Sequence, residues 1–179
     1  QKKPEQVQQF VDEGLKHLPE SMPLLAFRAQ LEIGAGDIDA ARATIAQMED
    51  TENDPDAVKL INAQILMAEK KWNKAVEHLE KLRPLMARSA EQTKRIDMAL
   101  AECFMKQGQP DRALDAYTRA LDNDPLHLQA QMGKAQALIA MGKTRQAEEI
   151  VRNVRGRTSS KDAQPAATAL LEVQKAVAE

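Results

Sequence analysis

Apolar residues recur along this chain at the three- and four-residue spacing of an amphipathic α-helix. One such run is formed by Val58, Ile61, Ile65 and Leu66. Residues at this spacing lie on one face of a helix, where a neighbouring element can cover them. Glycines follow several of these runs and allow the positive φ that ends a helix: Gly36, Gly108 and Gly142. The pattern predicts a chain of consecutive α-helices.

Small residues recur in two columns with a fixed period. The first column is Ala29, Ala63, Ala101 and Ala135, and the second is Ala41, Ala75, Ala113 and Ala147. Both columns have spacings of 34, 38 and 34 residues, so one insertion of four residues explains the irregular step. A period of this length is typical of a repeat protein made of stacked helix pairs. Alanine in both helices of a pair lets the two backbones approach closely.

Each repeat is predicted to hold two antiparallel helices joined by a short turn. Lys70 and Lys71 occupy the turn in the one repeat that lacks the glycine. The insertion falls between Pro84 and Ser89, where we expect the helix to gain about one turn. Asp54-Pro55 and Asp124-Pro125 mark the joins between repeats, because proline cannot continue the preceding helix and aspartate can cap the next one.

This register divides the chain into a single array. We expect half a repeat, with its second helix only, at residues 1–21. Four repeats follow at 22–55, 56–93 with the insertion, 94–127 and 128–161, and a closing helix covers 162–179, with Pro165 to Val177 as its body. The abrupt start at Gln1 suggests that the chain is cut from a longer protein.

The third repeat carries a recognisable set of small, aromatic, glycine and proline positions: Leu100, Ala101, Phe104, Gly108, Ala113, Tyr117, Ala120 and Pro125. In these positions the chain resembles the tetratricopeptide-repeat family. The resemblance implies a right-handed superhelical solenoid with a concave groove lined by the first helix of each repeat. Members of the family typically bind peptides or protein segments there. Arg28, Asn62 and Lys134 depart from the family pattern, which usually has leucine at these positions.

The same resemblance assigns a row of residues to the groove. They are Gln30, Ile33, Leu60, Gln64, Met67, Met98, Glu102, Met105, Met132, Gln136 and Ile139. Methionine suits adaptable apolar surfaces, and glutamine both donates and accepts hydrogen bonds. We therefore expect an apolar or amphipathic partner segment, with a helix among the candidates. The Lys/Asn clamp that some members use for a terminal carboxylate is missing at the matching positions. If the helices are rotated from the family standard, part of the methionine row packs inside the solenoid instead.

Composition and charge argue against several other classes of function. The formal net charge of −2 gives no field that attracts nucleic acid. No apolar run approaches the roughly 20 residues of a membrane span. The single cysteine, Cys103, lies in a predicted buried position and favours a reducing compartment such as the cytoplasm.

No residues form a catalytic, metal or cofactor site in this pattern. His17, His78 and His127 are scattered and lack carboxylate or cysteine partners at ligand spacing. The acidic residues between Glu49 and Asp56 lack the glycine and final glutamate of a helix–loop–helix calcium site. We therefore expect a protein that is not an enzyme and that needs no cofactor.

The leading hypothesis is a non-catalytic scaffold that binds a peptide or protein segment. An alternative is a docking region of a larger enzyme or secretion complex. A further alternative is self-association, in which the half repeat and an incompletely polar last helix, with Leu170, Leu171 and Val173, stack end to end.

Overall fold

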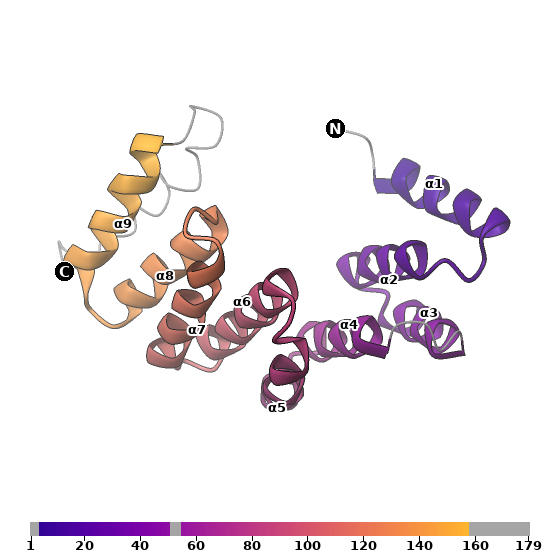
Figure 1. Ribbon diagram of the computed structural model, residues 1–179, viewed down its shortest axis with the longest axis horizontal. Coiled ribbons are helices and arrows are strands. Elements are labelled where there is room, and N and C mark those ends of the chain that lie inside the picture. Colours follow the sequence, from indigo (N-terminus) through magenta and orange to yellow (C-terminus); the bar gives the residue numbers. More distant parts are fainter. Residues whose placement is uncertain (1–3, 51–54, 158–179) are drawn as a thin grey trace. The chain divides into compact units, whose positions relative to one another are not determined.

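The computed structural model of the chain describes residues 4–50 and 55–157, and helices joined by short turns make up these ranges (Figure 1). The described residues form nine α-helices and one short 3-10 helix, with no strand. The elements are α1 (Pro4–His17), α2 (Met22–Ala35), α3 (Ile38–Asp50), α4 (Pro55–Ala68), α5 (Trp72–Leu82), η1 (Arg83–Met86), α6 (Ala90–Lys106), α7 (Pro110–Asn123), α8 (Leu128–Ala140) and α9 (Thr144–Arg157). The prediction of an all-α solenoid of antiparallel helix pairs is confirmed.

The chain divides into two compact units, residues 1–82 and residues 83–179. In the N-terminal unit α2 packs on α3, α4 packs on α5, and α2 also contacts α4. In the C-terminal unit α6 packs on α7, α8 packs on α9, and α6 also contacts α8. Each unit is therefore a short stack of hairpins in which the first helices of successive repeats are neighbours.

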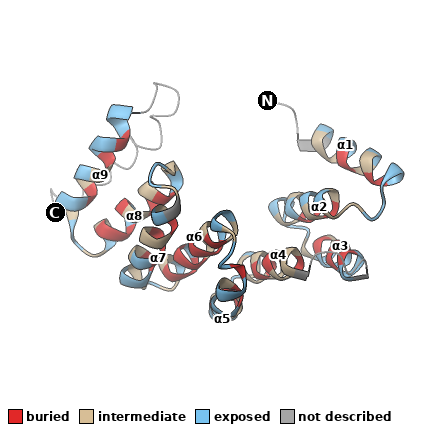
Figure 2. Ribbon diagram, viewed as in Figure 1, coloured by how far each residue is buried: buried red, intermediate tan, exposed pale blue. Residues whose placement is uncertain are grey.

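The alanines of the two columns lie inside the hairpins, away from solvent. All eight alanines have no exposed surface: Ala29, Ala41, Ala63, Ala75, Ala101, Ala113, Ala135 and Ala147. Larger apolar residues fill the space around them, and Figure 2 shows one buried face along most helices. Val58, Ile61 and Ile65 of the predicted apolar run are buried in the core of the N-terminal unit. The full burial of both columns fits the prediction that small residues stand where the helices of a pair pack together.

The first helix of each repeat ends with a residue in the left-handed backbone region. Gly36, Gly108 and Gly142 have φ values of 81°, 69° and 73°, and Lys70 takes the same conformation with φ 60°. After each of them, the next backbone N–H donates to a carbonyl five residues earlier, for example from Asp37 to Glu32 at 2.9 Å. The glycine prediction is confirmed, and Lys70 shows that the turn forms without glycine.

Two helix ends differ from the expectation. At the start of the insertion the chain forms η1, a 3-10 helix, rather than an extra α-helical turn of α5. Asp124 ends α7, so the prediction that it caps α8 is wrong. A turn closed by the bond from the His127 N–H to the Asp124 carbonyl precedes α8. His127 is therefore the cap, and its Nδ1 accepts a hydrogen bond from the Ala130 N–H at 3.2 Å.

The predictions for Asp54 and for a closing helix over 162–179 concern positions outside the described residues.

Candidate binding surface

The predicted groove residues all lie on first helices of repeats, so they form two faces, one in each unit. We call Gln30, Ile33, Leu60, Gln64 and Met67, on α2 and α4, the N-terminal face. We call Met98, Glu102, Met105, Met132, Gln136 and Ile139, on α6 and α8, the C-terminal face. Because α2 contacts α4 and α6 contacts α8, each face continues from one helix to its neighbour.

Most residues of the two faces reach the surface of the protein. Gln30, Glu102 and Gln136 are exposed. A second group is half-buried: Ile33, Gln64, Met67, Met98, Met105 and Ile139. Leu60 and Met132 are only 7% and 8% exposed, so these two contribute little area to any partner. Met132 packs in the core of the C-terminal unit with Leu138 and Val151.

The N-terminal face carries no charge of its own, because the charged side chains of its helices pair with each other. Arg28 Nε donates to Glu32 Oε1 at 2.9 Å, and Thr44 Oγ1 of α3 donates to Glu32 Oε2 at 2.8 Å. On α4, Lys59 pairs with Asp56 at 3.1 Å. Arg28, at a position where leucine was expected, thus neutralises the buried Glu32 carboxylate.

Gln64 and Phe27 add polar and aromatic character to the same two helices. Within the described part of the chain, the Gln64 Oε1 atom is buried and accepts no hydrogen bond. The Phe27 ring on α2 is 44% exposed, which is unusual for so large an apolar group. The Phe27 ring therefore adds an exposed apolar group to α2, next to the N-terminal face.

The C-terminal face differs because Glu102 places a carboxylate at its centre. Met98 lies four residues before Glu102 and Met105 three residues after it, so all three side chains share one side of α6. Burial and, to a smaller extent, the negative charge of Glu102 raise the pKa of the Tyr117 hydroxyl. The same two causes raise the pKa of the Cys103 thiol to about 12. Cys103 is buried, as expected, and stays a thiol at neutral pH.

Gly133 lets the Tyr117 ring of α7 lie directly on the backbone of α8. A Cβ atom added at Gly133 would overlap the Tyr117 ring, and it would lie 2.7 Å from the hydroxyl oxygen. Glycine in the middle of a helix costs about 1 kcal/mol relative to alanine. The packing of the ring is the reason for a glycine here.

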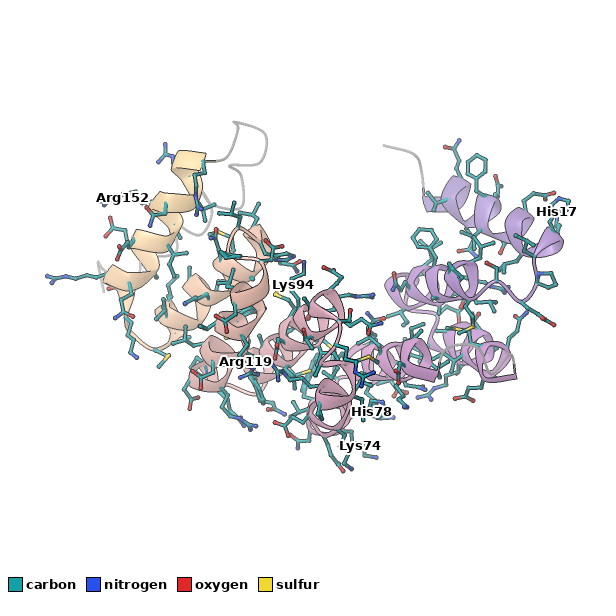
Figure 3. All side chains as sticks on the ribbon, in the orientation of Figure 1. His17, Lys74, His78, Lys94, Arg119 and Arg152 are labelled. Atoms are coloured by element: carbon teal, nitrogen blue, oxygen red, sulfur yellow. The ribbon has the colours of Figure 1, made fainter. Side chains whose placement is uncertain are left out.

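A buried carboxylate with two arginine partners is the main feature that the sequence analysis missed. Asp97 of α6 has no exposed surface. Arg83 of η1 donates to both Asp97 oxygens, at 2.8 and 3.0 Å, and Arg119 of α7 donates to Oδ1 at 2.9 Å. Figure 3 labels Arg119 on α7. The cluster joins three elements of the C-terminal unit, and η1, which begins directly before the insertion, supplies Arg83.

The histidines have local structural roles or remain at the surface. His78 of α5 hydrogen-bonds the Lys59 carbonyl of α4 at 3.1 Å (Figure 3), and His127 caps α8. His17 is exposed. Among the residues that the structure describes, no three His, Cys, Asp or Glu side chains gather as a metal site would require. Nor does any described helix have the length and apolar character needed to cross a membrane.

Comparisons with known proteins agree with this architecture. Two family models described as tetratricopeptide repeat match residues 104–171 and 22–47. No curated protein sequence matches the chain.

Solved structures give the fold. TPR-like repeats of a kinesin light chain-like protein from Podosopora anserina align with a TM-score of 0.72 at 19% identity, covering 89% of this chain and 88% of that one. PilF of Pseudomonas aeruginosa aligns with a TM-score of 0.68 at 14% identity, covering 96% and 83%. YrrB, a TPR protein with an unusual peptide-binding site, aligns with a TM-score of 0.58 at 13% identity, covering 94% and 93%.

Proposed function

The chain belongs to the tetratricopeptide-repeat family, whose solenoids generally serve as non-catalytic protein-interaction scaffolds. We therefore propose that the N-terminal face and the C-terminal face, each by itself, bind apolar or amphipathic segments of a partner protein. The observation that carries the proposal is the surface position of methionine and glutamine side chains on first helices. Met67, Met98 and Met105 are half-buried rather than sealed in the core.

The chemistry of the two faces supports a segment with apolar side chains. A methionine side chain is flexible and polarizable, so it adapts its shape to different apolar partners. Gln30 and Gln136 are exposed beside the apolar residues and offer amide donors and acceptors. A partner that lays apolar side chains on the methionines can therefore satisfy its polar groups on the glutamines.

The proposal is tested by replacing Met67, Met98 and Met105 together with glutamine. Glutamine has nearly the same length as methionine but removes the apolar contact. A library of displayed random peptides is selected on the wild-type protein, and the affinity of the best peptide is then measured by fluorescence polarisation. We expect the triple variant to bind that peptide at least about tenfold more weakly, since buried contacts at an interface centre dominate affinity.

The matched control is Met141→Gln, because Met141 is half-buried at the end of α8 and lies outside both faces. Wild-type affinity is expected for this variant. Circular dichroism confirms that each variant is folded. Unchanged peptide binding by a folded triple variant would refute the proposal.

A further inference from the structure

The C-terminal face differs from its counterpart at one position of the repeat. Gln30, Gln64, Glu102 and Gln136 follow one another with spacings of 34, 38 and 34 residues, so they occupy the same place on four successive first helices. Three of these residues are neutral amides and Glu102 is a carboxylate of nearly the same shape. The substitution changes the charge of the surface while leaving its form almost unaltered.

We propose that Glu102 determines specificity at the C-terminal face by selecting a helical partner segment that carries a lysine or arginine among apolar residues. This inference rests on the proposed function. The partner's cation pairs with the Glu102 carboxylate, and its apolar neighbours lie on Met98 and Met105. An acidic or purely apolar segment binds less well, because it leaves the carboxylate unpaired beneath the partner.

The position of Glu102 on α6 fits this partner. Met98 and Met105 flank it along the same side of the helix, both half-buried, while Glu102 itself is exposed. Side chains three and four residues apart are neighbours on a helix surface. A partner helix lying along α6 therefore meets an apolar, a negative and again an apolar position. On the neighbouring helix α8, Gln136 and Ile139 extend the surface.

Among the residues that the structure describes, none neutralises Glu102, which leaves its carboxylate available for a partner. Within residues 4–50 and 55–157, no Lys, Arg or His nitrogen forms an ion pair with its carboxylate within 4.0 Å. Lys106, one turn further along α6, is exposed and is not paired with it. Other carboxylates of this unit are paired, such as Asp124 with Lys94 and Glu148 with Arg152.

The N-terminal face provides the internal contrast. Gln30 and Gln64 stand at the equivalent positions there, and the charges of α2 and α4 pair with each other. That face has no net charge with which to prefer a basic segment. Among the four first helices compared, only α6 therefore carries the carboxylate that prefers a cation.

The test compares peptide selection on the wild-type chain and on Glu102→Gln, which restores the amide found at the three equivalent positions. We expect peptides selected on the wild type to be enriched in a lysine or arginine flanked by apolar residues three or four positions away. Selection on Glu102→Gln should lose that enrichment. Glu149→Gln is the control, because Glu149 is an exposed carboxylate on α9, outside the face.

A second measurement isolates the charge. In the tightest-binding arginine-containing peptide selected on the wild type, this arginine is replaced by citrulline, its neutral isostere. The replacement should weaken binding to the wild type and to Glu149→Gln by about fivefold. High salt should reduce this difference in affinity, because it screens the ion pair. Binding to Glu102→Gln should stay unchanged.

The outcomes separate this inference from the function on which it rests. Selected peptides that bind well but show no preference for a cation, or a citrulline effect that persists in Glu102→Gln, would overturn the role of Glu102 and leave the binding function intact. Failure of the wild type to select any peptide would overturn both.

Discussion

The N-terminal and C-terminal units bury a carboxylate in the same kind of hairpin but neutralise it differently. The Glu32 carboxylate accepts hydrogen bonds from Arg28 on its own helix and from Thr44 on the paired helix. Asp97 receives two guanidinium groups from two other elements, η1 and α7. Removing Glu32 leaves one arginine that is close to solvent, whereas removing Asp97 leaves two like charges side by side. The same backbone plan therefore supports a local polar contact in one unit and a cluster that joins three elements in the other.

The two units also differ in the charge that their binding faces expose to solvent. Charges on α2 and α4 are paired within each helix, which leaves the N-terminal face neutral. The C-terminal face carries the Glu102 carboxylate, which pairs with no basic side chain among the described residues. Because the helices repeat and the side chains do not, one array can present two surfaces with different partner preferences.

The largest expected effect is the loss of the buried carboxylate in the C-terminal unit. Asp97→Asn keeps the volume but places an amide donor against two guanidinium groups. We expect the free energy of unfolding to fall by about 3 kcal/mol, the lower end for a broken buried pair, because both arginine side chains remain 37% exposed. Urea denaturation followed by circular dichroism measures the change.

Glu32→Gln is the matched variant in the N-terminal unit. Its amide oxygen can still accept a hydrogen bond from Thr44, so we expect a loss of only about 1 kcal/mol. If both variants lost the same free energy of unfolding, the Asp97 cluster would contribute no more stability than the local contact of Glu32.

The next largest change in stability is expected from replacing glycines that lie inside helices, one in each unit. Gly133→Ala should destabilise the protein by about 2 kcal/mol, because the new methyl group overlaps the Tyr117 ring. Gly34→Ala should stabilise it by about 0.5 kcal/mol, since no atom lies within 4 Å of the added Cβ in α2. Melting temperatures by calorimetry would show opposite shifts.

Tyr117→Leu offers a check on the mechanism. With the ring removed, Gly133→Ala should cost much less than it does in the wild type. A full additive penalty in the double variant would mean that something other than the ring opposes a side chain at Gly133.

The smallest expected change in the free energy of unfolding comes from residues in the turns after the first helices. Lys70 adopts a φ of 60°, which costs a non-glycine residue about 1 kcal/mol, while Gly36 adopts a φ of 81° without that cost. Lys70→Gly should therefore raise the free energy of unfolding by up to about 1 kcal/mol, and Gly36→Ala should lower it by a similar amount. Denaturant titration of both variants checks the signs, and a loss of stability in Lys70→Gly would be the contrary result.

Much of the fold follows from local rules that can be applied to the sequence. The alanine columns are predictable because close helix contact admits only small side chains, and the period then repeats that requirement. Gly36, Gly108 and Gly142 are predictable because they supply the backbone conformation that ends a helix. Lys70 could be placed in the same turn by register alone.

The remaining features depend on contacts between residues that are distant in sequence. Asp97 follows Ile96 on the buried side of α6, where its charge gives no sign that Arg83 and Arg119 will neutralise it. Gly133 has a reason only once the Tyr117 ring is placed on α8.

For the two binding faces, helical spacing places the residues on one side of a helix but does not fix how far each is covered. Leu60 and Met132 occupy the same repeat position as the half-buried Met98, yet they are buried by packing that the pattern does not contain.

The neighbour-by-neighbour packing of the helices has a consequence for how the chain folds. Within each unit the packed helices are one or two places apart along the chain. Few residues must be brought together across a long loop, so little chain entropy is lost before the first contacts form. Proteins with such local contacts fold in roughly microseconds to milliseconds. In a repeat array the process can start at any hairpin and spread to its neighbours. The hairpins around Ala41 and Ala113 are thus equally valid starting points for assembling the molecule.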